Sequence, residues 1–323
     1  MYRIGIDLGG TNIAAGLVDE QFRIVAKEST PTLVGRPNEA IVDDIAALCK
    51  KVCAAAGAKE SDVASIGIAS PGVVDNDTGE IVYANNLGMR HFPIIPLLRE
   101  RVGIQKIYIE NDANAAAWGE AIAGAAKGSR SSVMITLGTG VGGGIVADGK
   151  VYKGFNSAAG ELGHIVIRVG GRQCTCGRQG CWEAYSSATG LIRTTTEKIE
   201  ECKKAGRATK MTDLVAAKGK VTGRTAFDAM RQGDEAAKEV VTEYVEYLAS
   251  GLASMINIFQ PEVLSIGGGI SNEGQYLLDL VVPLIRKQTY GTGLIPETDI
   301  RIAQLKNDAG IIGAAVLGME VSA

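Results

Sequence analysis

"YRIGIDLGGTNIAAGLVDEQF", at residues 2–22, is the stretch that decides the fold. An apolar run reaches Asp7, glycines turn the chain, and a second apolar run follows. This pattern predicts a strand, a tight turn and a second strand. It returns in "SSVMITLGTGVGGGIVADGKVYKG", at residues 131–154. We interpret the two stretches as an internal duplication, with one copy in each of two domains.

Strands and helices alternate along the rest of the chain. Further strands are expected at residues 22–30, 63–70, 106–112, 263–270 and 300–306. Helices are expected at residues 38–56, 113–126, 191–201, 235–259 and 309–320. Alternation of this kind is typical of an α/β fold with helices on both faces of the sheet.

The length of 323 residues predicts two domains, because single cores stop growing at about 250–300 residues. We expect a small N-terminal α/β domain at residues 1–115, completed by the C-terminal helix at about 306–323. The large α/β domain then covers residues 116–305 and carries the cysteine-rich loop described below.

Composition excludes several functions. Net charge is −3 and aromatic residues make up 5%, so a nucleic-acid or anionic membrane surface is not expected. No apolar run approaches 18 residues, and the start of the chain does not have the pattern of a signal peptide. We therefore expect a cytoplasmic protein whose thiols stay reduced.

Three glycine clusters each follow a predicted strand. They are Gly9-Gly10-Thr11, Gly138-Thr139-Gly140 and Gly267-Gly268-Gly269. Glycine lets backbone N–H groups approach an anion, so the three together predict a nucleotide site, with Asp7 placed to meet a hydrated magnesium ion. For any one cluster a simple hairpin turn is an equally good explanation, and none matches a Walker loop or a Rossmann loop.

A second polar group lies where a predicted strand gives way to a helix. Asn111 and Asp112 stand at this junction, and strand ends in α/β sheets are where ligands bind. A carboxylate is already ionised at neutral pH, so Asp112 is a candidate general base. The structural alternative is that Asp112 caps the helix.

The segment "ELGHIVIRVGGRQCTCGRQGCWE", residues 161–183, holds three of the six cysteines and one of the two histidines. His164, Cys174, Cys176 and Cys181 form a Cys3His set, which predicts a structural zinc site with no open position for catalysis. Gly177 and Gly180 allow the loop to fold back around the metal. The alternative is a loop of reduced cysteines. Cys49, Cys53 and Cys202 are expected to be small core residues.

Two glutamates bracket this segment. Glu161 lies three residues before His164, and Glu183 lies two residues after Cys181. A metal clamp would hold both carboxylates in fixed positions, where they suit hydrogen bonding to sugar hydroxyls. Taken singly, each glutamate is better explained as a solvated surface charge, and the bracketing of a metal clamp favours the role in sugar binding.

The sequence resembles the ROK kinases and repressors over most of its length. The matching motifs are "DLGGTN" (7–12), "ASPG" (69–72), "END" (110–112), "LGTGVGGG" (137–144), "ELGH" (161–164) and "CTCGRQGCWE" (174–183). The resemblance implies the actin-like (ribonuclease H-like) sugar kinase fold, with two domains and a cleft between them. Within the family, "CWEAYSSATGL" (181–191) is most similar to the bacterial glucokinases.

This resemblance implies phosphoryl transfer from Mg-ATP to O6 of glucose, with Asp112 as the general base. It further implies that the pyranose is held by Gly72, Asn85, Asn111, Asp112, Glu161, His164 and Glu183. His164 would serve the sugar with one ring nitrogen and zinc with the other. The nucleotide side would consist of Asp7 for magnesium, of Gly9, Gly10, Thr11, Asn12, Gly138, Thr139 and Gly140 for the phosphates, and of Gly268 near the adenosine. The family implies a homodimer or homotetramer.

Several alternatives stay open at this point. The sugar can be N-acetylmannosamine, N-acetylglucosamine, fructose or allose, because the sequence does not show what meets the substituent at C2. Polyphosphate as the phosphoryl donor is undecided. A non-catalytic sugar-binding regulator and a zinc-ribbon interaction module are the rival classes. The regulators of the family carry a helix-turn-helix before the sugar domain, and here the "DLGGTN" strand comes first.

Overall fold

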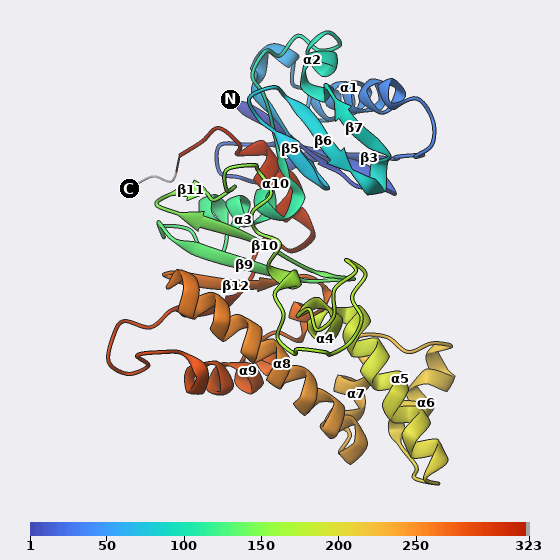
Figure 1. Cartoon of the computed structure of the whole chain (residues 1–323). Helices are drawn as coiled ribbons and strands as arrows, with labels where there is room; N and C mark the ends of the chain where they lie inside the picture. The colour runs from blue at the N-terminus through green and yellow to red at the C-terminus, as the bar shows by residue number, and fades with distance from the viewer. Residues whose placement is uncertain (321–323) are drawn as a thin grey trace. The chain divides into compact units, whose positions relative to one another are not determined.

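The computed structural model describes residues 1–320 and is an α/β structure. The first sheet has the strand order β3-β2-β1-β4-β8. Its edge strand β3 is labelled in Figure 1. Its strands are β1 (Tyr2–Leu8), β2 (Asn12–Val18), β3 (Ile24–Pro31), β4 (Val63–Ser70) and β8 (Ile107–Asn111). A smaller three-stranded sheet is formed by β5 (Val73–Asp75), β6 (Glu80–Ala84) and β7 (Met89–Phe92). The accompanying helices are α1 (Asn38–Ala55), α2 (Ile94–Arg99), α3 (Asp112–Ala123) and α10 (Ala309–Ala315).

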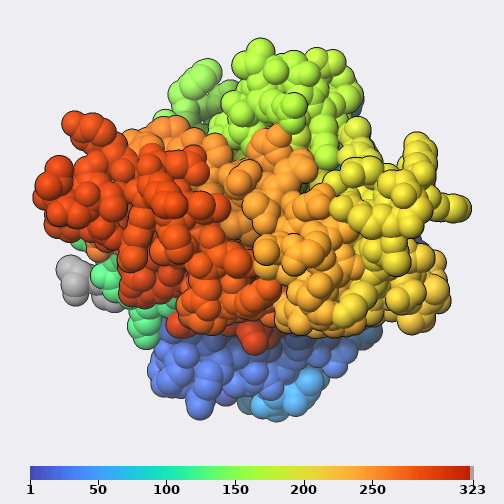
Figure 2. Space-filling view, turned by 90° about the horizontal axis from the view of Figure 1, so that it is seen from below, coloured from blue at the N-terminus to red at the C-terminus, as the bar shows by residue number. Residues whose placement is uncertain are grey.

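The second large sheet has the order β11-β10-β9-β12-β13. Its strands are β9 (Ser132–Leu137), β10 (Val141–Ala147), β11 (Lys150–Val151), β12 (Val263–Gly267) and β13 (Asp299–Ile302). Its helices are α4 (Glu183–Ser186), α5 (Ala188–Lys204), α6 (Lys210–Lys218), α7 (Thr225–Arg231), α8 (Glu235–Phe259) and α9 (Gln275–Gln288). Helix α8 packs against α5, α7 and α9, and Figure 2 shows their surface running from yellow through orange to red.

The chain forms two compact units. One contains residues 1–134 and 144–160 and the chain from residue 303 onward, and the other contains residues 135–143 and 161–302. The domain boundaries expected from the sequence stay a prediction, because compactness alone does not define an independently folding domain. The last three residues of the expected C-terminal segment, 321–323, lie outside the described part of the chain. No helix among residues 1–320 is long and apolar enough to cross a membrane.

The α/β class expected from the sequence is confirmed, with differences in detail. The sheet of β5, β6 and β7 was not predicted, because its short strands lack a clear alternation of polar and apolar residues. The expected strand at 263–270 ends at Gly267, where a 3-10 helix, η4 (Gly269–Glu273), takes over. The expected last helix ends at Ala315 instead of 320, shortly before Gly318, whose φ of +82° is left-handed.

A row of glycines crosses the first sheet and allows α10 to lie directly on the backbone. Gly16, Gly5 and Gly67 are register partners on β2, β1 and β4. A Cβ atom on Gly5 would lie 1.8 Å from the carbonyl oxygen of Ile311, and one on Gly67 would lie 1.8 Å from that of Ala314. No side chain fits in such a space, so the glycine row sets how closely the helix approaches the sheet.

We predict that Gly67→Ala destabilises the protein by about 3 kcal/mol, because the added methyl group meets helix backbone that cannot move aside. Urea unfolding monitored by circular dichroism measures this change. Gly269→Ala is the control, since a Cβ there meets nothing within 4 Å, and its effect should stay below about 0.5 kcal/mol. An unfolding midpoint of Gly67→Ala equal to that of the wild type would contradict the close contact.

Candidate functional site

The junction of β8 and α3 fixes the position of Asp112. Asn111 is the residue that caps α3, because its Oδ1 accepts the N–H groups of Ala113 (3.0 Å) and Asn114 (3.2 Å). Asp112 is the first residue of the helix, its side chain is exposed, and its Oδ1 accepts the Ala113 N–H at 2.7 Å. The capping explanation for Asp112 is therefore wrong, and its carboxylate stands at the helix N-terminus, where negative charge is stabilised.

Buried polar contacts stabilise the junction of β8 and α3. The Glu110 carboxylate is buried and pairs with the Lys153 ammonium at 2.8 Å. It also accepts the Asn111 N–H (3.0 Å) and an amide hydrogen of Asn114 (3.2 Å). Glu110 belongs to the "END" motif, but no spacing rule connects it to Lys153, which comes 43 residues later (153 − 110).

Gly72 and Asn85 lie on the same side of the first unit as Asn111. The Nδ2 of Asn111 donates to the carbonyl oxygen of Gly72 at 3.0 Å. Gly72 has φ +86°, and a Cβ there would lie 2.0 Å from the carbonyl oxygen of Tyr83, so the two backbones are in contact. The exposed Asn85 follows two residues later, with its Oδ1 3.4 Å from the Tyr83 hydroxyl. The first unit therefore brings Gly72, Asn111 and Asp112 together and places Asn85 beside them.

The first glycine turn joins β1 to β2. The Gly9 N–H donates to the carbonyl oxygen of Asn12 (3.0 Å), and the Thr32 hydroxyl donates to that of Gly9 (2.6 Å). Gly10 lies against Asn86, and the side chains of Thr11 and Asn12 are exposed. The turn is thus held by its own backbone and leaves its polar side chains available.

Asp7 lies at the end of β1, beside the first turn of α10. A Cβ on Gly310 would lie 2.9 Å from the Asp7 Oδ2. Burial raises the pKa of the Asp7 carboxyl group, and the positive charge of Lys27 opposes this shift. A partly buried carboxylate that is costly to ionise fits a position that receives a cation.

We predict that Asp7→Asn stabilises the metal-free protein more at pH 7.5 than at pH 4.5. A raised pKa in the folded state contributes stability at low pH that is lost as the pH rises through that pKa, and asparagine does not titrate. The difference in unfolding free energy, variant minus wild type, should therefore grow with pH. Urea titrations with a chelator present measure it, and a difference that shrinks with pH would refute the burial argument.

The second glycine turn lies at the start of α5. The Gly138 N–H donates to Gly140 (3.0 Å), the Ala188 N–H donates to Gly138 (2.8 Å), and the Thr189 hydroxyl donates to Thr139 (2.7 Å), each to the carbonyl oxygen. The third cluster lies beside it, as a Cβ on Gly268 would meet the backbone of Leu137 at 2.6 Å.

A cavity of about 340 Å³ opens at the second turn. It is lined by Thr139, Gly140, Gln173, Cys174, Thr175, Glu183, Ala184, Ser187, Thr189, Gly190 and Arg193. The sequence did not single out Thr189 or Arg193, whose place in the "SATGLIR" run at 187–193 is the only signal that they face this turn. The turn and the cysteine loop thus share one cavity.

The four expected metal ligands come together. One donor atom from each of His164, Cys174, Cys176 and Cys181 lies within 4.8 Å of all the others. The His164 Nδ1 is 3.7 Å from the Cys174 Sγ, and the Sγ atoms of Cys176 and Cys181 are 3.6 Å apart. Ligands about 2.3 Å from a tetrahedral zinc ion are separated by roughly 3.8 Å, so the donor set and its spacing fit zinc.

The pKa values of two of these thiols are shifted in opposite directions. A hydrogen bond from the Arg178 N–H lowers the pKa of Cys176, which is exposed. Burial raises the pKa of Cys181 to about 12, with hydrogen bonds from the neighbouring thiols adding to the shift. Gly177 (φ +89°) and Gly180 (φ +82°) are both left-handed, as expected for glycines that fold the loop back on itself.

Glu183 and the Glu161–His164 segment meet the same residue of β10. The Val141 N–H donates to the Oε2 of Glu183 at 3.0 Å. A Cβ on Gly163 would lie 2.1 Å from the Val141 carbonyl oxygen. The Cys174 Sγ is 3.7 Å from the Oε1 of Glu183, so this carboxylate lies between the cysteine loop and the second glycine turn.

Duplicated strand–turn–strand units with glycine turns, in two compact units, define the class of actin-like sugar kinases. The chain belongs to the ROK family, whose family model matches residues 3–321. The family resemblance and the fold class expected from the sequence are both confirmed.

Individual relatives are also similar to this chain over nearly its whole length. The glucokinase of Halalkalibacterium halodurans is 39% identical over 97% of this chain and 94% of its own length. The N-acetylmannosamine kinase of Citrobacter koseri is 30% identical over 98% of each. Among solved structures, a ROK family glucokinase from Streptomyces griseus in complex with glucose and AMPPNP is 36% identical, with a TM-score of 0.80 over 98% of this chain and 99% of that one.

Proposed function

We propose that this protein is an ATP-dependent glucokinase that phosphorylates glucose at O6. The observation that carries the proposal is the nearly full-length similarity to glucokinases, which exceeds that to an N-acetylmannosamine kinase by 39% to 30% in identity. A sugar kinase needs a fixed carboxylate, phosphate-binding turns and polar groups for the sugar, and the two units contain residues for each.

Asp112 is assigned as the general base. Its carboxylate takes the proton of the glucose 6-hydroxyl while O6 attacks the γ-phosphorus of ATP, and the bond from that phosphorus to the β–γ bridging oxygen breaks to release ADP. Exposure lets the carboxylate reach a substrate, and the Asn111 cap and the Glu110–Lys153 pair keep the helix start in place. Catalysis of this kind is mostly positioning and charge stabilisation.

Each unit, taken by itself, carries polar groups that are assigned to sugar recognition. In the first unit these are Gly72, Asn85 and Asn111, beside Asp112. In the second unit they are Glu161, His164 and Glu183. Carboxylates and amide groups recognise the pattern of hydroxyls, which is how glucose differs from its epimers.

The nucleotide is assigned to the glycine turns. Gly9, Gly10, Thr11, Asn12, Gly138, Thr139 and Gly140 are assigned to the phosphates, and Gly268 is assigned to the adenosine. Asp7 is assigned to the magnesium ion, which would offset the negative charge of the phosphates. Backbone N–H groups at such turns bind anions without a lysine.

His164, Cys174, Cys176 and Cys181 are assigned to a structural zinc ion. Zinc supplies a crosslink there and no chemistry, since four protein ligands complete its shell. The proposal includes a cytoplasmic location, where thiols remain reduced and able to bind zinc. It also includes assembly into a homodimer or homotetramer.

The experiment that tests the function is a coupled ADP-release assay with Mg-ATP and a panel of hexoses. The panel contains glucose, mannose, fructose, allose, N-acetylglucosamine and N-acetylmannosamine. We expect the highest kcat/KM with glucose. A higher value with another sugar would overturn the specificity and keep the kinase, whereas no turnover with any sugar would favour a non-catalytic sugar binder.

We predict that Asp112→Asn lowers kcat by about 10²–10⁴-fold, the usual contribution of a general base, and leaves glucose affinity within about 3-fold. Asparagine has nearly the same shape but does not accept a proton. Steady-state kinetics and calorimetric glucose titration measure the two effects.

Asp148→Asn is the matched control for this variant. It replaces an exposed turn carboxylate on the same unit and should leave kcat unchanged. An Asp112→Asn enzyme with more than a tenth of the wild-type kcat would remove Asp112 from the role of base.

A further inference from the structure

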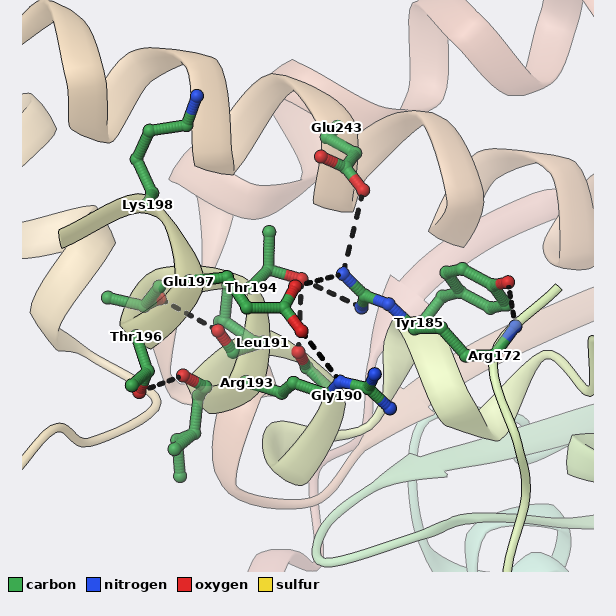
Figure 3. A network of polar contacts seen from close by, with 12 residues as sticks. Arg172, Tyr185, Gly190, Leu191, Arg193, Thr194, Thr196, Glu197, Lys198 and Glu243 are labelled. Atoms are coloured by element: carbon green, nitrogen blue, oxygen red, sulfur yellow. Dashed lines mark hydrogen bonds and ion pairs between the residues drawn. The ribbon is translucent and has the colours of Figure 1, made fainter. Parts of the chain in front are cut away.

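One residue outside the assigned site, Arg172, connects the cysteine loop (residues 161–183) to three helices. Arg172 lies two residues before Cys174, and only 14% of its side chain is exposed. Figure 3 shows its guanidinium group between Tyr185, Thr194, Glu197 and Glu243. These partners come from α4, α5 and α8, so a single side chain contacts three helices.

The side-chain contacts of Arg172 are specific to a guanidinium group. Its Nη1 donates to the Thr194 hydroxyl at 2.9 Å, and its Nη2 lies 3.0 Å from Glu197 and 4.0 Å from Glu243. The group also stacks 5.0 Å from the centre of the Tyr185 ring. A planar cation with several fixed donors makes all four contacts at once, whereas a lysine ammonium cannot.

The backbone of Arg172 closes the loop itself. Its N–H donates to the Tyr185 hydroxyl at 2.6 Å, and its carbonyl oxygen accepts the Gly180 N–H at 2.8 Å. The preceding residue must be glycine, because a Cβ on Gly171 would lie 2.1 Å from the same hydroxyl. The segment that contains all three cysteine ligands therefore starts from a point fixed on α4.

The same helix begins with Glu183. Tyr185, two residues further on, holds Arg172 on one side and packs its ring against Tyr247 of α8, with centroids 4.4 Å apart. A change at Arg172 thus acts on the metal ligands through Cys174 and on the Glu183 carboxylate through Tyr185. Neither effect requires Arg172 to contact the metal or the sugar.

We infer that Arg172 is a positioning residue that fixes the cysteine loop on α4, α5 and α8, and thereby sets both metal retention and sugar affinity. The part that concerns the sugar rests on the proposed function. Metal retention does not depend on it, so the two parts are measured separately.

The decisive variant is Arg172→Met, which keeps an unbranched apolar stem and removes the guanidinium group with its charge and its donors. We expect zinc release to a chelator to be about 10–100-fold faster and KM for glucose to rise by about 10-fold, as for residues that hold metal ligands in place. Values of kcat and of KM for ATP should stay within about 2-fold, because the second glycine turn has its own contacts with α5.

The matched control is Arg207→Met. Arg207 also bridges α5 and α8, through Glu201 (3.9 Å) and Glu239 (3.2 Å), and its Nε donates to the Cys202 Sγ of α5 (3.3 Å), so these partners all lie outside the loop. Losing such a surface pair should change each quantity by less than about 2-fold. If Arg172→Met and Arg207→Met have the same zinc release and the same KM for glucose, Arg172 has no positioning role and the inference fails.

Two further variants keep the inference testable if Arg172→Met folds poorly. Arg172→Lys should fall between the wild type and the methionine variant, and Tyr185→Phe, which removes only the hydroxyl, should also release zinc faster than the wild type. Equal zinc release in both variants and the wild type would refute the positioning role. If the wild type phosphorylates no hexose, the proposed function fails. The rate of zinc release still tests whether Arg172 positions the metal ligands.

A wild type that binds no zinc would instead refute the metal site. The positioning role of Arg172 is then tested by amide hydrogen exchange of residues 173–183. Exchange should be faster in Arg172→Met than in the wild type, and it should be unchanged in Arg207→Met.

Discussion

The constraint on which the first unit depends is the contact between α10 and the glycine row of its sheet. Backbone atoms of the helix meet backbone atoms of the strands, and no side chain separates them. Helix α3 packs equally closely on α10, because a Cβ on Gly313 of α10 would lie 1.8 Å from the carbonyl oxygen of Ala115 in α3. The far end of α3 is fixed as well, where the buried Glu120 accepts the N–H groups of Ala125, Gln304 and Leu305. A helix held along its length and at its end gives its first residue, Asp112, a defined position.

The second unit fixes its polar groups by other means. Its loop at residues 161–183 has almost no regular secondary structure, and its order comes from single contacts. Trp182 is fully buried at the end of the loop, donates its ring N–H to Tyr247, and packs so closely on α8 that only glycine fits at Gly251. Arg172 lies near the middle of the loop, and the four predicted metal ligands lie on either side of it, His164 before and the three cysteines after. Backbone hydrogen bonds across the loop support these contacts: the Ile167 N–H donates to Gly180 (2.9 Å) and the Trp182 N–H donates to Ile165 (2.8 Å), each to the carbonyl oxygen.

Much of this could be predicted from the sequence, and the reasons for success and failure are physical. The duplicated strand–turn–strand units were visible because buried strands are apolar and tight turns need glycine. The metal ligands were visible because three cysteines and a histidine lie within 18 residues (181 − 164 + 1). The three-stranded sheet, the Glu110–Lys153 pair and the Arg172 contacts were not, because each joins residues whose types are ordinary and whose separation follows no period. The role of Asn111 as the cap of α3 was also missed, since Asp112 fits a capping position equally well by residue type.

A general base must be held rigidly and still reach the substrate, and burial would satisfy only the first of these demands. Burying a carboxylate raises its pKa, as it does for Asp7. At Asp112 the neighbouring residues make the buried interactions: Glu110 is paired with Lys153, and Asn111 caps the helix. Glu183 follows the same principle in the second unit, where one carboxylate oxygen accepts the Val141 N–H and the rigid contacts belong to Trp182 and Tyr185 on either side. In both units the residues that give rigidity are separate from the carboxylates assigned to chemistry, which leaves Asp112 exposed and Glu183 half-buried.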